Sequence, residues 1–263
     1  MSEVFGTPAQ RAMQLRAQAL WTLLKSDRRI MCHGRLLSVS FETPDCVDLV
    51  LALTQLQGSA GFQNVPNDAV KMVQRPLHAA GLKTDIAKEW NVGANVLRHA
   101  DTILSSLQLL AGLFLHRVDA QTSPAKLEAL SNLAATNGEW LPMGLFLRGQ
   151  ARPSVFLYLS DSEDRSVAMS GCVVHANRFH PREDEGWWGM ISVAPEWRGK
   201  GLSRHVGAQV LRQMRIDFGT ENFTTIVRPD QTGFMNMCRH LGFTSARHSS
   251  IYVQDPSGVM NSE

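Results

Sequence analysis

The sequence has few cysteines and no long run of charges of one sign. Its four cysteines, Cys32, Cys46, Cys172 and Cys238, lie far apart in 263 residues, and no two of them form a Cys-x-x-Cys pair. This spacing is typical of reduced thiols rather than of a disulfide framework. The 26 basic and 24 acidic residues are mixed along the chain and give a net charge of +2. This balance excludes a broad basic surface, and therefore nucleic acid as an expected partner.

Long apolar segments are also missing. The segment Met1–Lys25 has Gln and Arg every few positions, so it lacks the apolar core of a signal peptide. The richest apolar stretch, Ile103–Leu115, has only 13 residues, fewer than a membrane span needs. We therefore expect a cytoplasmic protein with no membrane partner. The hydrophobic content of 44% is that of an ordinary globular protein.

Residues 1–111 carry no chemical motif and are expected to be a mainly helical region. The strand-then-helix opening of this region fits either a helical cap or a degenerate copy of the second half of the chain, and the sequence alone does not choose between them. The pattern predicts a strand over Arg35–Phe41, a loop over Gly58–Pro66, and helices over Thr7–Lys25, Thr43–Leu56, Asn67–Ala80, Thr84–Trp90 and Ala94–Leu110.

From residue 112 the pattern changes to alternating strands and helices. This alternation predicts an α/β domain with a mixed sheet over residues 112–256, followed by a tail of residues 257–263. The expected helix covers Ser123–Thr136, and the expected strands are Leu113–Val118, Val155–Leu159, Val167–His175 and Trp187–Val193.

The segment Ile191–Arg204 is the most informative part of the sequence. It runs from the end of a strand through a glycine-rich turn into a helix. Leu202, Val206, Val210 and Met214 recur every four residues, which defines an amphipathic helix beginning near Leu202. The first turn of such a helix has backbone N–H groups without intrahelical partners.

The glycines of this turn indicate a binding site for a diphosphate. Gly199 and Gly201 let the backbone approach a ligand closely, and the helix dipole favours negative charge at the same place. Arg198, Lys200 and Arg204 add positive charge. The spacing matches neither a P-loop nor a dinucleotide-binding fingerprint, so a different diphosphate ligand is expected.

The residues Val193–Ser203 resemble the acyl-CoA motif of the GNAT (N-acetyltransferase) superfamily. Arg198, Gly199, Lys200 and Gly201 match that motif, whereas Ser203 stands where glycine or alanine is usual. A second landmark of the family follows, with an expected strand over Thr224–Arg228, a helix over Gln231–His240, and the ending Leu241-Gly242-Phe243. The resemblance covers about residues 112–255, including a closing strand near Ser250–Val253.

The resemblance implies an enzyme that moves an acetyl group from acetyl-CoA to an amine by direct attack on the thioester. A small-molecule amine is expected as the acceptor rather than a protein, no metal is implied, and a homodimer is left open. The pantetheine arm would pair with the backbone of one strand, and Gln231 stands where the family has an asparagine. The expected cofactor-binding residues are Ile191, Ser192, Val193, Arg198, Gly199, Lys200, Gly201, Leu202, Ser203, Arg204 and Gln231.

Two catalytic residues are expected on the same basis. Glu185 precedes the expected strand Trp187–Val193, near where relatives place a carboxylate, and is the candidate base, with His175 and His180 as alternatives. Cys238 takes the place of the family's tyrosine acid. The other interpretations are a solvated acidic loop at Glu185 and a packed core thiol at Cys238.

Two other functions remain open at this stage. One is an acyl-CoA-binding sensor without catalysis, which the missing tyrosine favours, and the other is acyl transfer to oxygen or sulfur on the same scaffold. A zinc site is not expected. The side chains of Cys172 and His175 would leave opposite faces of a strand, and those of Cys238 and His240 would diverge on a helix.

Overall fold

The computed structural model describes residues 2–256, and its strands form one sheet of ten strands in the order β1-β2-β3-β10-β4-β9-β8-β7-β6-β5. The predicted tail, residues 257–263, lies outside the described residues, as does Met1. The strands are β1 (Ile30–Cys32), β2 (Leu37–Ser40), β3 (Ser59–Pro66), β4 (Lys83–Val92), β5 (Phe114–Arg117), β6 (Ser154–Ser160), β7 (Ser166–Val174), β8 (Glu185–Val193), β9 (Asn222–Val227) and β10 (Thr244–Gln254).

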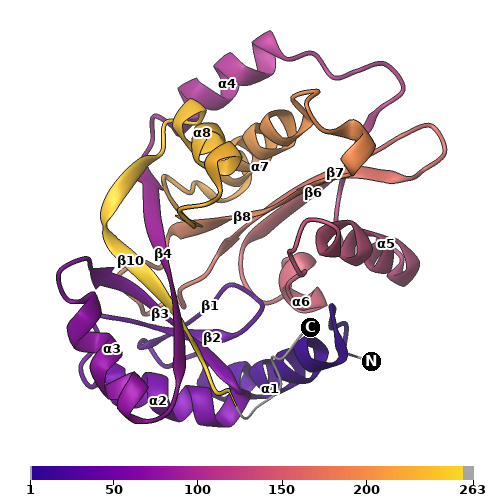
Figure 1. Cartoon of the computed structure of the whole chain (residues 1–263). Coiled ribbons are helices and arrows are strands. Elements are labelled where there is room, and N and C mark those ends of the chain that lie inside the picture. The colour runs from indigo at the N-terminus through magenta and orange to yellow at the C-terminus, as the bar shows by residue number, and fades with distance from the viewer. Residues whose placement is uncertain (1, 257–263) are drawn as a thin grey trace.

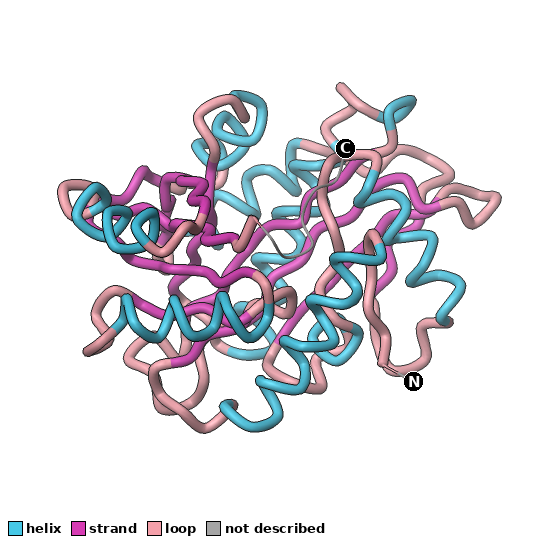
Figure 2. Tube along the Cα trace, turned by 60° about the horizontal axis from the view of Figure 1, so that its bottom comes forward, coloured by secondary structure: helices cyan, strands magenta, loops and turns pink. Residues whose placement is uncertain are grey.

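Helices cover the sheet in three groups (Figure 1), and the tube view shows them on both sides of the strands (Figure 2). One group lies beside β1–β3 and a second packs against β6–β8. The third lies at the opposite end of the molecule from the first, and its helix α7 also packs against β6–β8. In that order the groups are α1 (Pro8–Leu24), α2 (Cys46–Gln57) and α3 (Val70–Ala79); α5 (Pro124–Ala135) and α6 (Gly144–Leu147); and α4 (Val96–Ser106), α7 (Leu202–Phe218) and α8 (Thr232–His240).

Local sequence explains where the main helices begin and end. Thr7 and Gln10 form a reciprocal capping box at the start of α1, and Pro8 occupies its first turn. Helix α7 begins after Gly201 and ends before Gly219, and both glycines have left-handed backbone angles. One apolar face of α7, which includes Val206, is fully buried against the sheet.

The two halves of the chain repeat one arrangement and exchange a strand. Strands β2 and β3 are parallel and joined by α2, as β8 and β9 are parallel and joined by α7. After α3 and α8 the chain enters β4 and β10, respectively. Strand β10 lies between β3 and β4, while β4 lies between β10 and β9. Each half therefore completes the sheet of the other.

The mixed α/β architecture and the helices of the N-terminal region are confirmed, but two elements predicted there are wrong. Residues Thr84–Trp90 were expected to be helical and instead belong to β4, and the expected loop Gly58–Pro66 is mostly β3. Both strands pair with β10, about 150 or more residues away in the chain. Their conformation is thus determined by pairing partners that local propensity does not reveal. Of the helices described within residues 2–256, none has both the length and the apolar character needed to cross a membrane.

The side-chain amide of Gln57 forms hydrogen bonds with the backbone of Leu37 in β2, as a neighbouring strand would. It is fully buried at the end of α2, where its Oε1 accepts from the N–H of Leu37 at 3.1 Å and its Nε2 donates to the carbonyl of Leu37 at 3.0 Å. Because both backbone groups lose their partner when the amide is removed, we expect Gln57→Met to lower the free energy of unfolding by about 2 to 4 kcal/mol. Urea denaturation measures the change. The exposed neighbour Gln55 gives a matched control, since Gln55→Met should change stability by less than about 0.5 kcal/mol.

Candidate functional site

Strands β8 and β9 separate in the middle of the sheet. They pair over only three residues of each strand, ending at Trp187 and Thr224. Beyond this point the edge of β8 that faces β9 has no partner strand up to Val193. An unpaired strand edge offers N–H and C=O groups to an extended ligand.

A bulge lies in β8 where the strands part. Between Gly189 and Ser192 the pairing with β7 skips a residue, and Met190 has a φ of 54°. A left-handed angle at a methionine is a strained conformation, and strain of this kind clusters at binding and active sites. The bulge changes the direction of the backbone amides of β8 at the point where the gap opens.

The glycine-rich turn lies at the open end of this gap. Gly199 and Gly201 have φ values of 77° and 78°, which only glycine adopts without strain. Among the described residues, the backbone N–H groups from Gly199 to Arg204 have no hydrogen-bond partner, and no side chain caps α7. Gly199 is exposed and Gly201 partly exposed. These amides therefore form a candidate anion site at the start of α7.

Basic side chains surround the turn. The guanidinium of Arg198 is exposed and donates to Asn137 Oδ1 at 3.2 Å, which connects the turn to the loop after α5. The Lys200 Nζ lies 4.4 Å from the centroid of the Trp197 ring. The positive side chains and the helix dipole act in the same direction on an anion.

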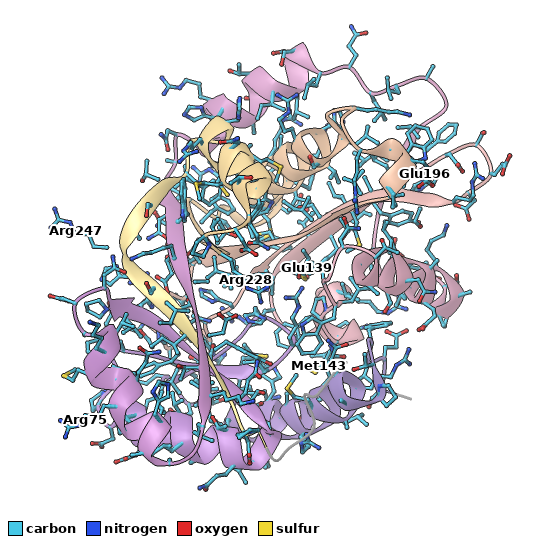
Figure 3. All side chains as sticks on the ribbon, viewed as in Figure 1. Arg75, Glu139, Met143, Glu196, Arg228 and Arg247 are labelled. Atoms are coloured by element: carbon cyan, nitrogen blue, oxygen red, sulfur yellow. The ribbon has the colours of Figure 1, made fainter. Side chains whose placement is uncertain are left out.

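A groove of about 350 Å³ leads from the turn into the molecule. One wall is the open edge of β8, including Ile191, and the other comes from Thr225 of β9 and Phe234 of α8. Ser203 lines its outer end and Arg35 its inner end. Figure 3 shows Glu139 and Arg228, two further lining residues, near the centre between the two parts of the sheet, with Glu196 of the turn farther out.

A second cavity of about 360 Å³ continues from the inner end of the groove. It lies on the face of β3, β4 and β10 that carries polar side chains, and Trp187 and Ile226 line both cavities. The floor of this second cavity combines Gln63 and Asp85 of the N-terminal half with Ser250, Tyr252 and Gln254 of β10. The two cavities therefore adjoin between the halves of the chain.

The match to a known family agrees with this geometry. Residues 127–243 match the model of the Acetyltransferase (GNAT) family. These residues form a GNAT acetyltransferase domain. The matched segment contains the parting strands, the glycine-rich turn and α8. No curated protein matches the chain.

Solved structures share the fold of the whole chain at low identity. A GCN5-related N-acetyltransferase from Kribbella flavida is 15% identical, with 95% of this chain and 97% of that chain covered and a TM-score of 0.54. A putative GNAT acetyltransferase from Novosphingobium aromaticivorans is also 15% identical, covers 95% and 99%, and has a TM-score of 0.54. A Drosophila protein is 13% identical, covers 94% and 89%, and has a TM-score of 0.57.

The structure brings most of the predicted cofactor residues of the GNAT domain together. Ile191, Val193, Ser203 and Gln231 line the groove, and residues 198–202 form the turn at its outer end. Gln231 Oε1 accepts from the N–H of Arg228 at 3.1 Å. Its amide NH₂ stays available to a ligand, since no partner for that group is found among the described residues. The side chain of Ser192 is buried and does not line the groove.

Glu185 lies apart from the groove of the GNAT domain. It begins β8, is buried, and its carboxylate contacts His175 Nε2 at 3.2 Å and Arg182 Nη1 at 3.1 Å. Burial alone raises the pKa of Glu185, but the hydrogen bond with His175 and the charge of Arg182 outweigh this effect and hold the pKa below its ordinary value. His175 and His180 belong to the same buried cluster, which lines neither cavity.

Cys238 also lies outside the groove. Its side chain is fully buried in the core between α8 and the sheet, and burial raises the pKa of its thiol to about 12. Its neighbours Phe234 and Met237 line the groove, as does Gly233 of the same helix. Within residues 2–256, no group of three His, Cys, Asp or Glu side chains is placed to hold a metal ion.

Several lining residues were missed by sequence reasoning. Arg35 comes from the N-terminal half, Trp140 and Glu139 from the loop after α5, and Arg228 from the end of β9. The position of Arg228 at the end of a predicted strand was a usable signal. The other three have no local pattern, because they reach the cavity only through the order of strands in the sheet.

His33 lines the second cavity, and its protonation affects the stability of the fold. It stacks on Trp187 with 4.7 Å between ring centroids, and burial, helped by the positive charge of Arg35, lowers its pKa to about 3. In the unfolded chain the imidazole of His33 has a pKa of about 6.5, so between this pH and about pH 3 the unfolded chain binds a proton that the folded chain does not bind. Stability should therefore fall as the pH drops from about 6.5 towards 3, with a loss of about 2 kcal/mol at pH 5 from His33 alone.

The variant His33→Phe keeps a ring against Trp187 and removes the titrating group. Urea denaturation at pH 7.5 and pH 5.0 should show a pH-dependent loss that is about 2 kcal/mol smaller in His33→Phe than in the wild type. The exposed His240 provides the control His240→Gln. Equal losses in the wild type and His33→Phe would contradict the assignment.

Proposed function

We propose that this protein is an acyltransferase that moves an acetyl group from acetyl-CoA to a primary amine. The observation that carries the proposal is the continuous groove. It begins at the unpaired amides before and within the first turn of α7, follows the open edge of β8, and meets a second cavity at Trp187. The match to a GNAT acetyltransferase family supports acyl transfer as the reaction class.

The residues fit acetyl-CoA in two places. The amides from Gly199 to Arg204, with Arg198 and Lys200 beside them, would hold the diphosphate. The backbone of Gly189–Val193 would pair with the amide groups of the pantetheine arm as with an added strand. The side-chain amide of Gln231 faces the same groove and would donate to a carbonyl of the arm.

Acetyl-CoA supplies an activated thioester, and the chain supplies position and environment. The amine nitrogen forms a bond to the thioester carbonyl carbon, the carbon–sulfur bond breaks, the amine proton leaves, and the thiolate gains a proton. An unpaired N–H of the β8 bulge would donate to the carbonyl oxygen as negative charge develops there. The ring walls of Trp140 and Trp187 restrict water at the junction.

The acceptor must react as a neutral amine. An alkyl ammonium of pKa about 10.4 loses its proton at pH 7 at a cost of about 4 to 5 kcal/mol. The apolar surfaces of Trp140, Trp187 and Ile226 disfavour the charged form at the junction, which reduces this cost. Glu185 and Cys238 line neither cavity, and neither has a role in the proposed reaction.

The direct test is turnover with the full chain. The protein is incubated with acetyl-CoA and a panel of primary amines, and release of the CoA thiol is followed with a thiol reagent. An enzyme gives thiol release that depends on the amine, together with the acetylated amine by mass spectrometry. Acetyl-CoA binding without release for any amine is the result expected of a sensor, the candidate that the buried thiol at position 238 favours, and would overturn the proposal.

A second test concerns the diphosphate site. Charge reversal in Arg198→Glu removes a cation from the turn, so acetyl-CoA affinity measured by calorimetry should fall at least about tenfold. Arg75 of α3 is also exposed and points away from the centre of the molecule (Figure 3). Arg75→Glu makes the same change in net charge and should leave the affinity unchanged. Equal affinities of all three proteins would contradict the location of the site.

A further inference from the structure

We infer that the acceptor is an amine that also carries a carboxylate, and that Arg35 of the N-terminal half binds that carboxylate. The inference rests on the proposed acyl transfer and names its substrate class. It comes from the position of Arg35, its unused hydrogen-bond donors and the balance of charges around the two cavities.

Arg35 lies where the two ligands would meet. It lines both the groove along β8 and the polar second cavity. Its guanidinium lies 5.5 Å from the ring centroid of Trp140 and 5.8 Å from that of Trp187. Its side chain is only 11% exposed, so water competes weakly for its charge. A planar guanidinium held between aromatic rings is oriented for paired bonds to a carboxylate.

Most donors of Arg35 are unused. A guanidinium has five N–H donors, and only one bond from Arg35 is found among the described residues, from Nη2 to Glu139 Oε2 at 2.9 Å. Its Nε is buried and has no partner. Buried donors without partners are costly, and an anion at the junction would relieve this cost. The carboxylate of Glu139 is more exposed, at 31%.

The chain holds Arg35 in place through its neighbour Gly34. Gly34 has a φ of 90°, and its carbonyl accepts from the N–H of Met143 at 2.7 Å. A side chain at position 34 would overlap Pro142 and Phe146. The backbone before Arg35 is thus packed against the same loop that supplies Trp140 and Glu139. This contact crosses from the N-terminal half to the GNAT domain.

The charges around the cavities suit a zwitterion. Within the described part of the chain, the charged residues that line the two cavities are Arg35, Arg228, Glu139 and Asp85, which sum to zero. Arg228 is paired with Asp85 at 3.5 Å, and both are more than half exposed. An acceptor with one ammonium and one carboxylate keeps this balance, with Arg35 for its carboxylate and Glu139 near its amine. A polyamine or a dianion would leave buried charge uncompensated.

The test compares acceptors that differ only by a carboxylate. Phenylalanine with phenethylamine, and leucine with isopentylamine, are such pairs, and kcat/KM is measured for each with the full chain and acetyl-CoA. We expect the wild type to prefer the carboxylated member. Arg35→Met should lower kcat/KM for that member about 10- to 100-fold and change the value for its partner by less than about threefold. Arg35→Lys should fall between the two, because the charge stays and the planar fork is lost.

The comparison separates a binding role from a structural one. Arg75→Met removes an exposed arginine elsewhere and should change neither acceptor. Equal loss for both members of a pair in Arg35→Met, or a wild type that prefers the decarboxylated amines, would overturn the inference while leaving acyl transfer intact.

Should no amine be acetylated, the proposed function fails, and calorimetry of phenylalanine and phenethylamine against the wild type and Arg35→Met still decides the role of Arg35. Tighter binding of phenylalanine that depends on Arg35 would support that role. Equal binding of the two ligands, or a phenylalanine affinity unchanged in Arg35→Met, would overturn it.

Discussion

The parting of β8 and β9 is the feature on which the site depends. Two parallel strands that pair over three residues and then separate leave a row of backbone groups without partners. Buried backbone groups are nearly always paired, so this edge has a ligand-binding character that a continuous ladder would lack. The bulge at Met190 and the glycine-rich turn after the strand lie at the two ends of the same opening.

The exchange of β4 and β10 explains why the N-terminal half belongs to the site. Strand β4 borders β9 on the side away from β8, and β10 carries the polar floor of the second cavity next to β3. Removing β4 would leave β9 at a sheet edge, and removing β10 would leave β3 and β4 at sheet edges. The arrangement of β2, α2 and β3 resembles that of β8, α7 and β9, but the loop before α2 carries Glu42 and Asp45 where the loop before α7 carries basic residues. Acidic side chains at that position repel an anion.

The accuracy of sequence reasoning differed between the two halves for a physical reason. The segment Ile191–Arg204 was predicted closely, because a strand end, two glycines and an amphipathic helix are all local patterns. Residues Lys83–Val92 contain good helix formers such as Ala87, Lys88 and Glu89, yet they form β4 between two strands from the end of the chain. Pairing and burial outweigh a local preference that is worth less than about 1 kcal/mol per residue.

The sequence by itself determined the candidate anion site at the start of α7 and the helix that forms it. Backbone angles at Gly199 and Gly201 and the apolar spacing of α7 need no distant contact. Only the tertiary structure decided what faces this site. It enclosed Glu185 in an ion pair and buried Cys238, and it placed Arg35 between Trp140 and Trp187. More than 100 residues of chain separate Arg35 from either tryptophan, and it is the order of strands that brings them together.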